Sequence, residues 1–287
     1  METAADYATD AWAATRAALP YVVLVGLVAG VLATGGLRLL GGPGRGALLA
    51  AGGAALAMTG VLLWRLGLDW PAVEAMNRVP WLAAGALALG FLLAVWGPSE
   101  GVLRTIAGIA AALAVWWLAG TPVAPSLHTA LIVLVPLAVW GVVLWRMHHI
   151  ATRDQGLVAH LVAMPAGLAA VAVLLDAGWS AGTAGGVAAC AFGQLLWVWD
   201  RARFPGNALT VVGAGGTVLA LGTALVKAQV VPWPAALLLA AVVFTDAPAR
   251  ALIPAKGVIR GVWAPVAFLL AAAAPVALAL GAAYLWP

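Results

Sequence analysis

The stretch VWAPVAFLLAAAAPVALALGAAYLW, residues 262–286, decides the fold because it is one apolar run without a charged side chain. An α-helix rises about 1.5 Å per residue, and the hydrocarbon core of a bilayer, roughly 30 Å thick, takes about 20 helical residues per crossing. The run is long enough to cross. Because no water reaches that core, a spanning segment must satisfy its backbone groups internally, which favours a helix.

Nine further apolar runs precede this one, separated by short polar or glycine-rich breaks. We therefore predict an all-α polytopic integral membrane protein with about ten transmembrane helices, the range being eight to ten. A single transmembrane helical domain, 20–287, would follow an amphipathic N-terminal lead-in, 1–19. The predicted spans are 20–40, 46–66, 80–97, 102–120, 127–147, 157–177, 180–199, 207–227, 232–248 and 262–286.

The composition excludes a soluble fold. Hydrophobic residues make up 65% of the chain and charged residues 8%, and the mean hydropathy is +1.06. A soluble domain needs far more polar surface than this. The net charge of +4 does not indicate nucleic acid, because the basic residues lie at the ends of the predicted spans. We expect membrane lipids, and protein partners in a membrane complex, as the interacting molecules.

The basic residues also predict an orientation. Ten lysines and arginines fall in the loops after the odd-numbered spans, and four fall on the other side. Basic residues favour the cytoplasmic side of a membrane. This bias predicts a protein of the cell (cytoplasmic) membrane with both termini on the non-cytoplasmic side. Most of the fifteen tryptophans lie near span ends, as expected of anchors at the membrane interface.

Three short matches recur in the same order and suggest a parallel internal repeat of four helices, 20–120 and 180–286. The clearest pairs Val79-Pro80-Trp81 with Val231-Pro232-Trp233, and another pairs Gly101–Arg104 with Gly257–Arg260. Transporters are often built from such repeats. Chance is the alternative, since a chain rich in Ala, Leu, Val and Gly repeats short peptides easily.

Ionisable residues inside a bilayer are costly and mark functional sites. The middles of the first five spans contain none, whereas the ninth span ends in Phe244-Thr245-Asp246-Ala247-Pro248-Ala249-Arg250. Asp246 and Arg250 are four residues apart and can pair on one helix face. Pro248 lies between them and predicts a break or kink. We predict that a substrate contacts Thr245, Asp246 and Arg250; the alternative is an ordinary charge pair at the membrane interface.

Gln194, in the seventh span, is the most polar side chain predicted near the bilayer centre, and we include it as a second substrate contact. Its alternative role is a hydrogen bond to a neighbouring helix. The four histidines are read as interfacial residues, and Cys190 is the only cysteine, so neither a metal, a cofactor nor a catalytic residue is predicted. The spacings Gly26-x-x-x-Gly30 and Gly182-x-x-x-Gly186 predict close helix packing.

Three functions remain open from the sequence. The first is a transporter or flippase of a small or lipid-like molecule, supported by the ten spans, the repeat and the Asp246 break. The second is a non-catalytic subunit or assembly factor of a larger membrane complex, supported by the shortage of buried polar groups. The third is an enzyme acting on a lipid at the cytoplasmic face, using charged residues such as Asp246 and Arg250.

Overall fold

The computed structural model describes residues 4–123, 126–151, 156–199, 207–254 and 259–286, and these form helices and turns with no β-strand. The helices are α1 (Ala4–Leu40), α2 (Gly42–Ala50), α3 (Gly53–Leu66), α4 (Ala75–Trp96), α5 (Glu100–Leu118), α6 (Leu127–Ala151), α7 (Gly156–Leu174), α8 (Gly178–Val198), a π-helical segment (Leu209–Gly215), α9 (Gly216–Lys227), α10 (Trp233–Ala240), a 3-10 segment (Ala241–Phe244), α11 (Asp246–Ala251) and α12 (Ile259–Leu285).

Nine helical segments of the described chain are long and apolar enough to cross a membrane, which confirms the prediction of an all-α polytopic membrane protein. The remaining predicted span, the ninth, 232–248, is built differently. It starts as the short apolar helix α10, passes through the 3-10 segment and ends in α11. The chain therefore passes through the bundle ten times, and this pass is interrupted.

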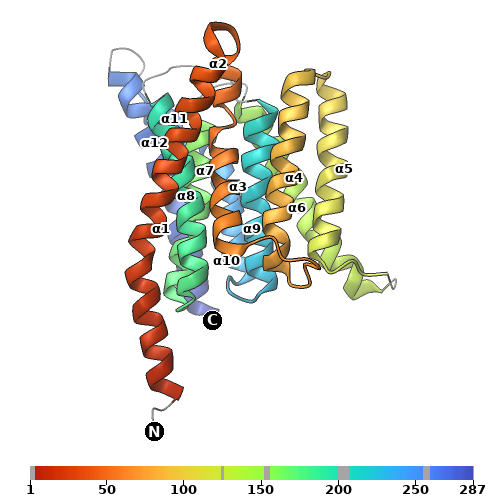
Figure 1. Cartoon of the computed structure of the whole chain (residues 1–287), viewed down its shortest axis with the longest axis vertical. Helices are drawn as coiled ribbons and strands as arrows, with labels where there is room; N and C mark the ends of the chain where they lie inside the picture. Colours follow the sequence, from red (N-terminus) through yellow and green to blue (C-terminus); the bar gives the residue numbers. More distant parts are fainter. Residues whose placement is uncertain (1–3, 124–125, 152–155, 200–206, 255–258, 287) are drawn as a thin grey trace.

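The helices stand roughly parallel, and the N- and C-termini lie at the same end of the bundle, drawn at the bottom of Figure 1. We call this the lower end. The loop between α1 and α2 and the short helix α11 lie at the opposite, upper end. An even number of passes accounts for the shared position of the termini.

Glycines bring α1 and α8 into close contact. A Cβ atom added at Gly26 would collide with the carbonyl oxygen of Gly186, and one added at Gly30 would collide with that of Cys190. On α8, a Cβ at Gly193 would lie 2.7 Å from the carbonyl oxygen of Leu27. In a bilayer such close approach replaces the hydrophobic effect as the source of helix association. The spacing Gly26-x-x-x-Gly30 and, on α8, Gly186 serve the packing role expected of them, whereas a Cβ atom at Gly182 would make only an ordinary contact, 3.5 Å from Arg65 Nη2.

Candidate functional site

The interruption between α10 and α11 is where the chain departs most clearly from a regular span. The predicted break is present, but it covers Ala241–Phe244 and Thr245, one turn before Pro248. Pro248 itself is helical, in the first turn of α11, where a missing N–H is tolerated. Its ring would clash with the carbonyl of residue 244 in a continuous helix, so the distortion is displaced to the preceding turn.

Asp246, the first residue of α11, is buried, with 3% of its surface exposed. The predicted pair with Arg250 exists, with 3.7 Å between Arg250 Nη2 and Asp246 Oδ2. The nearer partner is Arg146, near the end of α6, whose Nη2 donates a hydrogen bond to Asp246 Oδ1. Charge compensation is what makes a carboxylate tolerable at such a place.

Arg146 also binds the backbone of the interruption. Its Nε donates to the carbonyl oxygen of Val243 at 3.4 Å, and its guanidinium lies 5.8 Å from the ring centre of Phe244. The described bonds use two of the five N–H groups of the guanidinium. Arg146 therefore satisfies a carbonyl freed by the broken helix and keeps donors for a further acceptor.

His160 of α7 completes this group of side chains. Its Nε2 lies 3.2 Å from Thr245 Oγ1, and Thr245 Oγ1 donates its only proton to the carbonyl oxygen of Val242 at 2.8 Å. Thr245 must therefore accept from His160, so the imidazole carries its proton on Nε2. In the neutral imidazole Nδ1 is then an acceptor. It is buried and has no hydrogen-bond partner among the described residues. We call Arg146, His160, Thr245, Asp246 and Arg250 the polar cluster.

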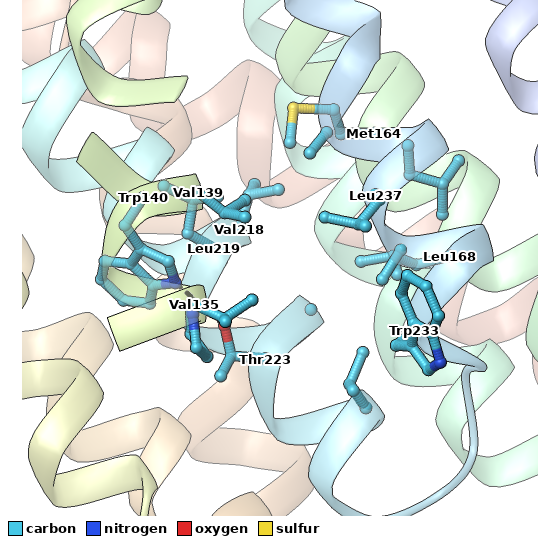
Figure 2. Close-up of a pocket in the computed structure, with 16 residues that line it drawn as sticks. Val135, Val139, Trp140, Met164, Leu168, Val218, Leu219, Thr223, Trp233 and Leu237 are labelled. Atoms are coloured by element: carbon cyan, nitrogen blue, oxygen red, sulfur yellow. Dashed lines mark hydrogen bonds between the residues drawn. The ribbon is translucent and has the colours of Figure 1, made fainter. Parts of the chain in front are cut away.

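A cavity of about 200 Å³ lies between α6, α7, α9 and α10. Figure 2 shows Trp140 and Thr223 on one wall and Leu168, Leu237 and Trp233 on the other. We call it the first cavity. Its lining is almost wholly apolar, and the one hydrogen bond within it joins Trp140 Nε1 to Thr223 Oγ1 at 2.9 Å. The lining residues are Val135, Pro136, Val139, Trp140, Met164, Leu168, Val218, Leu219, Gly222, Thr223, Val226, Trp233, Ala236, Leu237, Leu239 and Ala240.

Gln194 does not join the polar cluster in its hydrogen bonding. Its Nε2 donates to the carbonyl oxygens of Ala50 and Ala51, at 3.2 and 3.1 Å, and its Oε1 accepts from Ala54 N–H at 3.3 Å. These groups flank Gly52, where the second span is interrupted between α2 and α3. Gln194 thus forms the helix–helix hydrogen bonds that were the alternative role, and its contact with a substrate stays a prediction.

Sequence reasoning brought Thr245, Asp246 and Arg250 together but missed Arg146 and His160. In the sequence Arg146 resembles any basic residue at the end of a predicted span, and His160 was expected at the interface. The structure buries His160 completely. One signal was available, since His160 is the only polar side chain in the run from Gly156 to Leu174.

No group of three or more His, Cys, Asp or Glu side chains in the described parts of the chain could hold a metal ion. No protein-family model matches this chain, and no curated protein matches it in sequence. The site thus consists of the polar cluster, at an interrupted helix, and the apolar first cavity next to it.

Proposed function

We propose that the protein is a transporter or flippase that moves a lipid-like amphiphile, whose apolar chain occupies the first cavity and whose polar headgroup binds the polar cluster. The observation that carries this proposal is that the same helices form both parts. Met164 lines the cavity one turn after His160 on α7, and Val139 lines it two turns before Arg146 on α6. At 1.5 Å per residue, these steps are about 6 and 10 Å along the helices.

The chain of α10 also runs from the first cavity to the polar cluster. Ala240 lines the cavity at the end of α10, and the chain then runs through the 3-10 segment to Asp246. An amphiphile lying along α6, α7 and α10 would meet apolar side chains first and charged groups at the upper end. This change from apolar to charged surroundings matches a membrane lipid, which has an apolar part and a polar headgroup.

The polar cluster offers complementary bonds to a headgroup. Arg146 retains N–H donors for an acceptor such as a phosphate or carboxylate oxygen, and guanidinium groups bind such anions well. His160 Nδ1 offers an acceptor for a hydroxyl or another donor. We therefore favour an anionic headgroup that also carries a donor.

The helix interruptions support transport over a purely structural role. Two of the ten passes are broken near the upper end, at Gly52 and at Ala241–Thr245. Discontinuous helices of this kind form the substrate sites of many secondary transporters and give them segments that can rearrange. The basic bias makes the upper end the cytoplasmic one under this proposal.

The test is reconstitution of the purified protein into vesicles that contain a fluorescent phosphatidylglycerol. Loss of signal on adding a membrane-impermeant quencher reports how fast the lipid moves between leaflets. We expect faster movement than in protein-free vesicles. A lipid product of changed mass would favour the enzyme instead, and unchanged movement together with a stoichiometric co-purifying protein would favour the complex subunit.

A further inference from the structure

The chain contains a second apolar cavity, of about 260 Å³, which also borders α6. It lies between α4, α5 and α6 and is bounded by the π-helical segment and α9. Small side chains of α4 and α5 leave the space, among them Gly85, Ala86, Ala107, Ala110, Ala111 and Ala114. Gly85 is exposed, and a Cβ atom added there would meet nothing within 4 Å. The second cavity is therefore open to a side chain or to hydrocarbon.

One residue lines both cavities. Trp140 of α6 belongs to the wall of the first cavity and to the wall of the second. Its side chain is buried, and the hydrogen bond from Nε1 to Thr223 Oγ1 fixes the orientation of the indole. An indole N–H in an apolar interior needs such a partner, so this single bond holds the ring of Trp140 in place between the two cavities.

The volumes of the two cavities indicate what their separation by Trp140 does. Pockets that bind drug-sized ligands measure about 300–1,000 Å³. Each cavity alone falls below that range, whereas the two joined would fall within it. We propose that Trp140 determines substrate selectivity: by separating the second cavity from the first, it favours an amphiphile with one hydrocarbon chain over one with two. This inference rests on the proposed function, because it assigns the chain to the first cavity.

The experiment compares two fluorescent probes with the same headgroup in the vesicle assay, lysophosphatidylglycerol with one chain and phosphatidylglycerol with two. The measured quantity is the ratio of their translocation rates. The wild type should favour the single-chain probe. Trp140→Ala should lower that ratio by about tenfold or more, the scale on which small changes in pocket volume alter selectivity.

Two further variants keep the test decisive if Trp140→Ala does not fold. Trp140→Leu removes the ring but keeps an apolar side chain. Thr223→Val keeps the shape of residue 223 and removes the acceptor that orients the indole, so it should lower the ratio partially. Trp145→Ala is the matched control, because Trp145 lies on the same helix with 55% of its surface exposed and lines neither cavity.

A double variant shows whether a lower ratio in Trp140→Ala comes from joining the two cavities or from a general loss of packing. Gly85→Leu fills the second cavity, so Trp140→Ala/Gly85→Leu should regain the wild-type ratio. Gly108→Leu, at an exposed glycine of α5 with open space around it, should not restore it. Equal rates for both probes in the wild type, or an unchanged ratio in every Trp140 and Thr223 variant, would overturn the inference and leave the proposed function standing. Movement of neither probe by the wild type would end both.

Discussion

Arg146 and Asp246 stand one hundred positions apart in the chain and form an ion pair that joins α6 to the start of α11. The carboxylate is buried at a place where the helix ladder is interrupted. Its charge is compensated by Arg146 and by Arg250, and Arg146 also serves the carbonyl of Val243. Arg146 therefore both neutralises the charge of Asp246 and stabilises the interrupted backbone next to it.

Replacing Asp246 with Asn should impair transport without preventing membrane insertion. The amide keeps the shape but leaves two guanidinium groups without the carboxylate between them. Removing one partner of a buried ion pair costs roughly 3–5 kcal/mol. We expect a lower midpoint of thermal unfolding and at least a tenfold lower translocation rate. Asp246→Glu, which keeps the charge, is the control. A folded Asp246→Asn protein with full activity would support the alternative of an ordinary interfacial pair.

The topology prediction concerns both ends of the chain. The ten-to-four bias in lysine and arginine predicts that Met1 and Pro287 face the non-cytoplasmic side. Fusions of a reporter active only outside the cytoplasm should give signal at both positions. Signal at both positions from a reporter active only in the cytoplasm would reverse the assignment of the upper end.

The contact between α1 and α8 predicts a sharp difference between two glycines of α1. A Cβ atom at Gly30 would collide with the carbonyl of Cys190, whereas one at Gly36 meets nothing within 4 Å. Gly30→Ala should destabilise the fold by about 1–3 kcal/mol, as overpacking does. Gly36→Ala should be neutral or stabilising by up to ~1 kcal/mol, because alanine favours a helix. Equal unfolding midpoints for the two variants in detergent would contradict the packing described here.

Gln194→Leu should lower stability and leave probe selectivity unchanged. The substitution strands the carbonyls of Ala50 and Ala51 and the N–H of Ala54. Buried groups left without partners cost about 1–3 kcal/mol each. The carbonyl of Ala51 keeps one partner, because Thr210 Oγ1 also donates to it at 2.9 Å, so the expected destabilisation is smaller there. A variant with wild-type stability and an altered ratio of probe rates would instead support Gln194 as a substrate contact.

Much of the fold could be predicted from the sequence because a bilayer imposes it. The length of each apolar run, the glycine spacings of α1 and α8 and the proline after Asp246 each carry a direct physical meaning. The partner of Asp246 could not be predicted, since the pairing of α6 with α11 depends on helix packing that no local pattern encodes. The break at Gly52 was missed for the same reason, because the groups that satisfy it come from α8 and from Thr210. The parallel repeat of 20–120 and 180–286 stays a prediction.

The most direct test of the central claim fills the first cavity and measures lipid movement. Gly222 lines that cavity, and a Cβ atom there would make an ordinary contact, 3.6 Å from Leu168 Cδ1. Gly222→Leu should therefore fold and occupy the space proposed for the substrate chain. Gly60→Leu, at an exposed glycine of α3 with nothing within 4 Å, is the matched control. Vesicles with Gly222→Leu should move the fluorescent lipid no faster than protein-free vesicles, while Gly60→Leu should match the wild type. Wild-type rates in a folded Gly222→Leu protein would contradict the proposed function.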